Sequence, residues 1–200
     1  MKRFILRVAV ALLTFILGIW AFLMWETVRA PWKDAPRSDQ LTLVMTAPTT
    51  VVRRESASPF TIYVTNNSDQ KVTLVHPGDG SEVGWRTPIV QWSILENGDA
   101  SVHPAFPQPD RRFSRCGNID NLKWRDVFTL DPGETKQLEA FMPPFRKPGS
   151  YKVKFLYENR PSLEWQGYEM RIHHPLAMWR VRHSTECTLA SNEISLTVIE

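Results

Sequence analysis

A long apolar run near the N-terminus constrains the fold of this chain more than any other feature. Residues 4–25 are apolar except at Arg7, Thr14 and Gly18. A helix needs about 20 apolar residues to cross the hydrocarbon core of a membrane, whereas the apolar region of a cleaved signal peptide has roughly 7–15. The length of the run therefore predicts a transmembrane anchor helix over residues 4–25.

The residues that follow this run argue against cleavage. The only near match to a small-x-small cleavage site after the run, Val28-Arg29-Ala30, is followed by Pro31, which would hinder a signal peptidase. Trp20 and Trp25 lie near the far end of the run, where aromatic side chains are typical of the membrane interface. We therefore expect the anchor to be retained.

Basic residues before and inside the run set the expected orientation. Lys2, Arg3 and Arg7 favour a cytoplasmic N-terminus at residues 1–3, although further basic residues after the run weaken this asymmetry. Residues 26–40 are polar, contain two prolines and show no periodicity, which predicts a tether. The folded domain is expected to begin near Leu41 and to lie outside the cytoplasm, in a periplasm or at the cell surface.

After the tether, the sequence alternates apolar and polar residues with a period of two. Such alternation, bounded by Gly, Pro, Asn and Asp, is typical of strands, and no later stretch shows a sustained helical period. The predicted strands are 41–46, 60–66, 71–75, 89–95, 126–130, 135–141, 151–157 and 193–199. About seven to nine short strands with turn residues between them predict an all-β, antiparallel sandwich over residues 41–200.

One segment carries a resemblance to a known fold family. Residues 130–159, LDPGETKQLEAFMPPFRKPGSYKVKFLYEN, combine a PGE turn, an alternating strand and a PG-x-Y-x-V strand. This pattern resembles the second half of immunoglobulin-like and fibronectin-like domains of bacterial surface proteins, and residues 191–198 look like their last strand. The resemblance implies an immunoglobulin-like sandwich in which Tyr151 fixes the corner that enters a central strand.

The glycine-rich stretch at 75–88 was tested against phosphate-binding and metal-binding motifs. Its glycines have neither the G-x-G-x-x-G spacing nor the lysine of a P-loop, and its acids do not match a calcium loop. We interpret it as a connection between strands. If it is instead a recognition surface, Trp85 and Arg86 are the candidate contacts with a partner, because these residue types are enriched at interface hot spots.

The chain has two cysteines, Cys116 and Cys187. In an oxidising compartment two cysteines favour one disulfide, while two buried free thiols are the alternative. Such a bridge would close a loop of about 70 residues and stabilise the fold by ~4 kcal/mol.

Residues 159–186 form an insertion rich in aromatic, histidine and methionine side chains. We predict a hairpin with strands at Tyr168–His173 and Leu176–Arg182, whose aromatic residues cover a sheet edge. A partner-binding hairpin is the alternative, with Trp165 and Trp179 as candidate contacts. A metal site is not expected, because His173 and its neighbour would point to opposite faces of a strand.

These observations favour a non-catalytic protein-interaction or structural module of the cell envelope. The net charge of +3 is small and evenly spread, so nucleic acid is not an expected partner. No acid pair, catalytic triad or metal cluster emerges with meaningful spacing, so neither an enzyme nor a cofactor is expected. Three alternatives stay open: an accessory subunit of a membrane enzyme, a metal-handling assembly factor, or a module similar to a proteinase inhibitor. The sequence identifies neither the envelope partner nor a small-molecule ligand.

Overall fold

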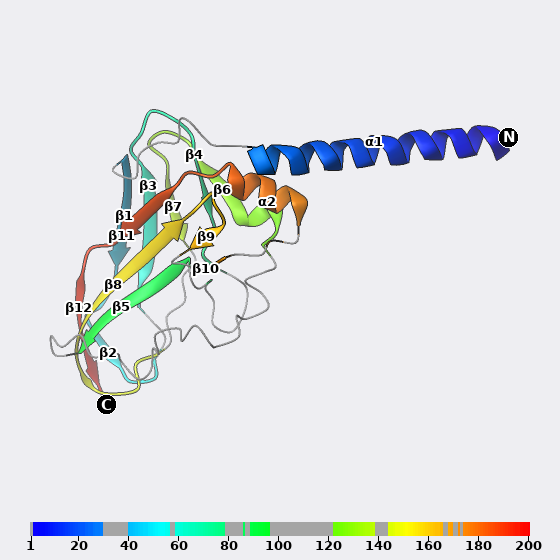
Figure 1. Ribbon diagram of the computed structural model, residues 1–200. Coiled ribbons are helices and arrows are strands. Elements are labelled where there is room, and N and C mark those ends of the chain that lie inside the picture. The colour runs from blue at the N-terminus through cyan, green and yellow to red at the C-terminus, as the bar shows by residue number, and fades with distance from the viewer. Residues whose placement is uncertain are drawn as a thin grey trace.

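The chain folds into a long N-terminal helix followed by a β-rich domain (Figure 1). The computed structural model describes residues 2–29, 40–56, 59–78, 86, 89–96, 122–138, 144–165, 168–169, 172 and 174–200, with side chains of the first helix described for residues 3–23.

Helix α1 runs from Lys2 to Arg29, and its side chains from Arg3 to Phe22 are exposed. The segment Arg3–Leu23 is long and apolar enough to cross a membrane. The helix also continues four residues into the predicted tether, so residues 26–29 are helical. We attribute this extension to the absence of a helix breaker before Pro31.

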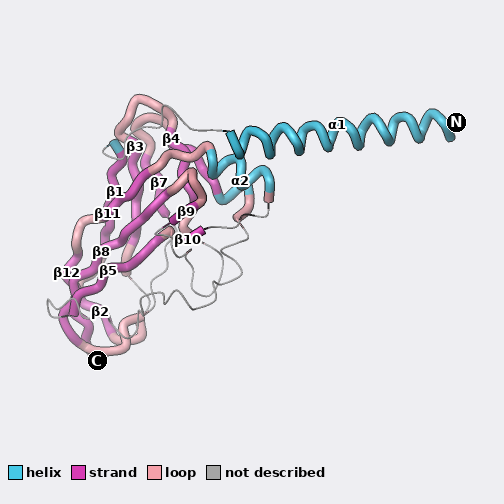
Figure 2. Tube along the Cα trace, in the orientation of Figure 1, coloured by secondary structure: helices cyan, strands magenta, loops and turns pink. Residues whose placement is uncertain are grey.

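The remaining described elements are mostly short strands, and Figure 2 shows the helical segments gathered at one end of the domain. The strands are β1 (Leu41–Thr46), β2 (Val51–Arg53), β3 (Thr61–Asn66), β4 (Val72–Val75), β5 (Val90–Glu96), β6 (Val127–Leu130), β7 (Thr135–Leu138), β8 (Gly149–Asn159), β9 (Glu164–Trp165), β10 (Tyr168–Glu169), β11 (Cys187–Ala190) and β12 (Ile194–Ile199). The helices are the short 3-10 helix η3 (Trp124–Asp126) and α2 (Pro175–Arg182). All eight predicted strands are present within a few residues of their expected bounds.

Two larger sheets form most of the domain. One has the order β1–β3–β7, and all of its pairs are antiparallel. In the other, the long strand β8 pairs with β5 along one edge and with β12 and β11 along the opposite edge. Strand β2 then adds to β12 in parallel. Strands β4 and β6 form a separate antiparallel pair, as do β9 and β10.

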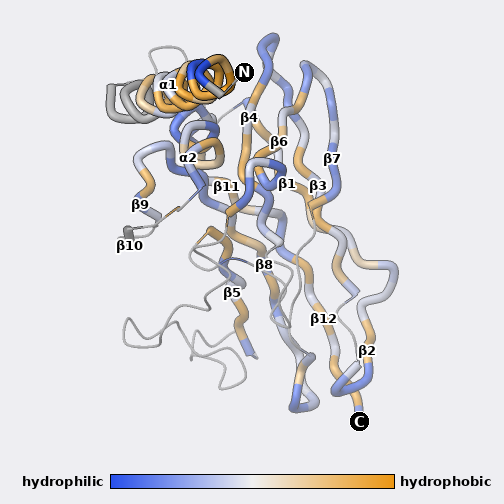
Figure 3. The backbone as a smooth tube through the Cα atoms, turned by 90° about the vertical axis from the view of Figure 1, so that its right-hand side faces the viewer, coloured by the Kyte–Doolittle hydropathy of each residue, from blue (hydrophilic) through white to orange (hydrophobic). Residues whose placement is uncertain are grey.

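Alternation along the strands places one face of each larger sheet in a common core. In β1 the buried residues are Leu41, Leu43 and Met45, as the period-two pattern predicts. The buried apolar residues of β8 and β12 belong to the same cluster, which also contains the core of β3. Phe155 in β8 is fully buried, and its ring lies 4.9 Å from the ring of Trp92 in an edge-to-face arrangement. Figure 3 shows apolar positions alternating with polar ones along these strands.

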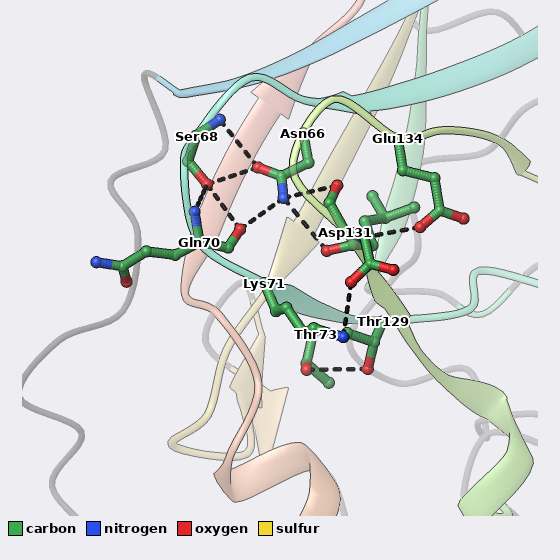
Figure 4. A network of polar contacts seen from close by, with 9 residues as sticks. Asn66, Ser68, Gln70, Lys71, Thr73, Thr129, Asp131 and Glu134 are labelled. Atoms are coloured by element: carbon green, nitrogen blue, oxygen red, sulfur yellow. Dashed lines mark hydrogen bonds and ion pairs between the residues drawn. The ribbon is translucent and has the colours of Figure 1, made fainter.

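The buried side chain of Asn66 connects the turn after β3 to the turn after β6. Asn66, at the end of β3, donates from Nδ2 to the carbonyls of Gln70, Leu130 and Asp131 at 2.7, 3.2 and 3.1 Å. Its Oδ1 accepts from the backbone and the hydroxyl of Ser68 (Figure 4). These bonds tie the β3–β4 turn to the β6–β7 turn, so one side chain satisfies backbone groups of both connections.

The prediction of a second strand at Leu176–Arg182 is wrong, because these residues form most of helix α2. His174 caps the helix by accepting from the backbone N–H of Ala177 at 3.4 Å, and Pro175 occupies the first turn, where its missing N–H is harmless. Ala177 and Val181 are both fully buried, which is the i, i+4 spacing of one helical face. Eight residues are too few for this period to stand out against alternation in the sequence.

Candidate functional site

Arg86, expected on a recognition loop, is buried with only 3% of its surface exposed. Its Nη2 lies 2.7 Å from Oδ2 of Asp126 in η3, and its Nη1 donates to the carbonyl of His76 at 2.6 Å and to that of Gly78. The guanidinium therefore joins the segment after β4 to η3. The side chain is thus bonded inside the described part of the domain, and its role as a partner contact stays a prediction. Trp85 lies outside the described residues.

Trp165, a candidate contact in the insertion, is also buried, with 0% of its surface exposed. Its Nε1 donates to the carbonyl of Glu158 at 3.1 Å, so the indole both fills the core and satisfies a polar group of β8. The third candidate, Trp179, is half-buried on α2, and its ring centroid lies 4.3 Å from that of His183. Of the predicted contacts that the structure describes, Trp179 is the one that is not fully buried.

Tyr151 lies in β8, and its hydroxyl donates to the carbonyl of Lys147 at 2.9 Å. The side chain is 1% exposed and packs against Phe145, with ring centroids 4.7 Å apart. A hydrogen bond from a tyrosine to the backbone a few residues upstream is the contact that defines a tyrosine corner.

Cys187 is a buried free thiol at the start of β11, whereas Cys116 lies outside the described residues. Burial raises the pKa of the Cys187 thiol from 9.0 to about 12. The thiol is therefore protonated at neutral pH and is a poor nucleophile. The disulfide between the two cysteines stays a prediction.

A different set of residues forms the surface nearest to α1, around α2 and η3. Trp124 in η3 is 57% exposed and Leu176 in α2 is 44% exposed. Arg180 joins the two elements, because its guanidinium lies 5.5 Å from the centre of the Trp124 indole and its Nη1 donates to the Trp124 carbonyl at 2.6 Å. We call this surface the α2 face; it comprises Lys123, Trp124, Arg125, Leu176 and Arg180.

The α2 face is basic. Lys123 and Arg125 are exposed and Arg180 is half-buried. The acidic residue next to them, Asp126, is held by Arg86 and by the backbone N–H of Lys123 at 2.9 Å. Arg86, inside the domain, therefore neutralises the charge of Asp126. The described side chains of the α2 face then carry a net positive charge.

Helix α2 is held in place by hydrogen bonds at its C-terminal end and by packing contacts. At its C-terminal end the buried side chain of Asn159 donates to the hydroxyl of Ser184 at 2.8 Å and to the carbonyl of Thr185 at 2.6 Å. The backbone N–H of Thr185 in turn donates to the carbonyl of Thr73 in β4 at 2.7 Å. Helix α2 also contacts η3 and β6 of the domain, and it contacts α1. The helix is thus fixed between the β domain and α1, and Figure 1 shows it beside the end of α1 nearest the domain.

The sequence reasoning missed the α2 face. Trp124 follows a long irregular stretch and lies four residues from Phe128, which gave no reason to single it out. Two segments carry its signal in the sequence, LKWRD at 122–126 and the basic PLAMWRVR of α2. Nothing in the sequence shows that these two segments meet in space.

The described part of the domain offers no group of three or more His, Cys, Asp or Glu side chains arranged to hold a metal ion. Its buried polar side chains include Asn66, Arg86 and Asn159, and each is bonded to the backbone or side chains of neighbouring elements. The geometry that stands out is therefore a surface beside a long apolar helix. No protein-family model, no curated protein and no solved structure matches this chain.

Proposed function

We propose that this chain is a single-pass membrane protein whose β domain lies outside the cytoplasm and acts as a non-catalytic interaction module of the cell envelope. The observation that carries the proposal is the contact between α1 and α2. An apolar helix with exposed side chains from Arg3 to Phe22 needs a lipid environment, and its direct contact with α2 places the domain next to that environment.

The strand order supports an immunoglobulin-like sandwich. One sheet has the order β1–β3–β7, and the other has the order β2–β12–β8–β5, in which β2 runs parallel to the last strand. This corresponds to an immunoglobulin arrangement in which the first strand is divided between the two sheets. Tyr151 adds the tyrosine corner of such domains. Folds of this kind present loops and edges to partners more often than they carry catalytic residues, but the fold alone does not assign an activity.

The polar interior supports a structural rather than a catalytic role. Tyr157 is buried, and its hydroxyl donates to the carbonyl of Val75 at 2.7 Å and accepts from the backbone N–H of the same residue at 3.1 Å. Burial raises the pKa of this phenol well above its ordinary value, which suits a neutral cross-link between β8 and β4 rather than an acid or a base.

The end of the domain opposite α1 offers a surface for a protein partner. Val51 in β2 is 51% exposed and Ile199 in β12 is 44% exposed. Because Val51 pairs with Thr197, it shares a face with Ile199. Strand β2 is the last described strand of its sheet, and Figures 1 and 3 place it far from α1. We assign the envelope partner to this distal surface, because exposed apolar side chains on an edge strand are typical of interaction sites.

Site-specific photo-crosslinking of the full-length chain in native membranes tests the proposal. A photo-reactive phenylalanine analogue replaces Val51 in one variant and Thr42, an exposed residue of β1, in the control. We expect one protein to be captured reproducibly from position 51 and not from position 42. Extraction of the membranes at alkaline pH should leave the chain in the pellet. Release by alkaline extraction, or the same set of adducts from both positions, would refute the proposal.

A further inference from the structure

We infer that the α2 face rests on the bilayer that α1 spans and binds anionic lipid head groups there. This inference rests on the proposed function, because it requires α1 to be a transmembrane helix. It adds a second membrane contact, made by the folded domain itself, and it names the ligand as a negatively charged lipid surface.

The length of α1 sets the height of α2 above the membrane core. Residues Arg3–Leu23 span about 32 Å at 1.5 Å per residue, which matches a hydrocarbon core of about 30 Å. The six helical residues from 24 to 29 then extend about 9 Å further, through a head-group layer of roughly 5–7 Å. Because α2 lies beside this end of α1 (Figure 1), it is placed at the level of the head groups.

The exposed side chains of the α2 face have the chemistry of a membrane interface. Tryptophan is enriched where the hydrocarbon core meets water, since its ring is apolar and its N–H can remain hydrated. Trp124 is more exposed than any other large apolar side chain of the described domain, and Leu176 adds a second apolar group on the neighbouring helix. Both side chains would bury their apolar surface in the membrane interface instead of exposing it to water.

The charges of the α2 face complement an anionic surface. Lys123, Arg125 and Arg180 supply three cations, while the carboxylate of Asp126 is already paired with Arg86. Basic residues held near an anionic leaflet each favour binding by an amount that corresponds to about a fivefold change in the equilibrium. Arg180 is also stacked on Trp124, so an apolar wedge and a cation are presented together.

The contact would fix the orientation of the domain. The contact between α1 and α2 sets the angle between the domain and the anchor helix, and a contact of α2 and η3 with the bilayer would also set the angle between the domain and the membrane plane. The distal surface around Val51 and Ile199 would then face a constant direction, which raises the effective concentration for a partner in the same membrane.

Photo-crosslinking to lipid in a system without other proteins tests this inference. The full-length chain is reconstituted into phosphatidylcholine vesicles and into vesicles that also contain phosphatidylglycerol. A photo-reactive phenylalanine analogue replaces Leu176 in one variant and Ile199 in the matched control, since both side chains are 44% exposed. We expect lipid adducts from position 176 and few from position 199, with more adducts at 176 when phosphatidylglycerol is present.

A charge variant separates electrostatic binding from simple proximity. Lys123→Gln with Arg125→Gln removes two exposed cations from the surface and leaves Arg180 and Trp124 in place. The equilibrium constant for binding of the α2 face to the bilayer should fall by about 25-fold in phosphatidylglycerol vesicles. It should change little in phosphatidylcholine vesicles. Equal labelling of positions 176 and 199, or labelling at 176 that ignores both lipid charge and the double substitution, would overturn the inference.

Alkaline extraction of the same vesicles keeps this test independent of the proposed function. A chain that resists extraction but gives no lipid adduct at position 176 retains its anchor and loses the second contact, so only this inference fails. A chain that is released by extraction loses both. A protein adduct at 176 in native membranes, without a lipid adduct in vesicles, would assign the α2 face to a protein partner and would also overturn the inference.

Discussion

The guanidinium of Arg86 and the carboxylate of Asp126 form an ion pair of 2.7 Å, with side chains that are 3% and 19% exposed. The pair connects the residues after β4 to η3, and η3 presents Trp124 to the surface beside α1. An interaction in the interior thus sets the position of an exposed aromatic residue. The same arginine lies in the glycine-rich stretch that suggested a recognition loop, and its bonds join residues 76–78 to η3.

Replacing Asp126 with asparagine should destabilise the domain by about 3 kcal/mol, because it leaves the Arg86 charge buried without a counter-charge. The measurement is urea unfolding of the full-length chain in detergent micelles. Arg54→Gln is the matched control, since it breaks an ion pair with Glu200 whose side chains are 51% and 74% exposed. The control should change stability by less than ~1 kcal/mol. Similar losses in both variants would contradict a buried role for Arg86.

The network around Asn66 predicts a large difference between two adjacent asparagines. Asn66→Ala removes hydrogen bonds to three carbonyls and leaves buried backbone groups without partners, so we expect a loss of about 3 kcal/mol. Asn67→Ala removes one exposed bond to the hydroxyl of Thr42 and should cost ~0.5 kcal/mol or less. Unfolding curves of the two variants under one set of conditions provide the comparison. If Asn67→Ala were the more damaging change, the assigned role of Asn66 would be wrong.

Strands were predictable from the sequence because their signal is local. In β1, Leu41, Leu43 and Met45 alternate with polar or exposed residues, and the structure buries these three residues. The turn between β6 and β7 and the start of β8 could also be predicted, because each has a Pro-Gly pair. In the first of these turns, Gly133 takes a left-handed conformation with φ of 76°, which suits glycine. The helix α1 could be predicted for the same reason, because a continuous apolar run is also a local signal.

The candidate site was not predictable, because it depends on contacts between distant segments. Trp124 and Arg180 are 56 residues apart and meet only when α2 packs on η3. Conversely, Arg86 was chosen as a contact because its residue type is common at interfaces, and Trp165 because it lies in the insertion at 159–186, but the fold buries both. Residue type alone does not tell a buried bonding role from an exposed binding role. The local pattern also failed at 176–182, where seven residues fit either a strand or a helix.

Tyr151→Phe should lower stability by about 1 kcal/mol, since it removes one hydrogen bond to the Lys147 carbonyl and keeps the ring packed on Phe145. Tyr63→Phe in β3 is the control, because no hydrogen bond from the Tyr63 hydroxyl is recorded among the described residues. Thermal unfolding of both variants in the same micelles measures the difference. A loss for Tyr63→Phe as large as that for Tyr151→Phe would show that the corner hydrogen bond contributes little.

The raised pKa of Cys187 predicts a loss of stability at alkaline pH. In the folded chain, burial moves the thiol pKa from 9.0 to about 12, so the unfolded chain releases its proton at a lower pH than the folded chain does. The stabilisation is fully present below pH 9 and is lost as the pH rises from 9 towards 12. Tyr157, whose pKa burial also raises, acts in the same direction at higher pH.

Cys187→Ala isolates the contribution of the thiol. The variant should be less stable than the wild type at pH 7.5, because a buried side chain is truncated, but its stability should fall less steeply between pH 9 and pH 11. Urea unfolding of the reduced full-length chain at a series of pH values gives both slopes. The free thiol should also react slowly with iodoacetamide at pH 8 until urea is added, since reaction requires the thiolate and access to it. Rapid labelling of Cys187 in the folded chain, or parallel pH curves for wild type and variant, would show that this thiol ionises as freely as it does in the unfolded chain.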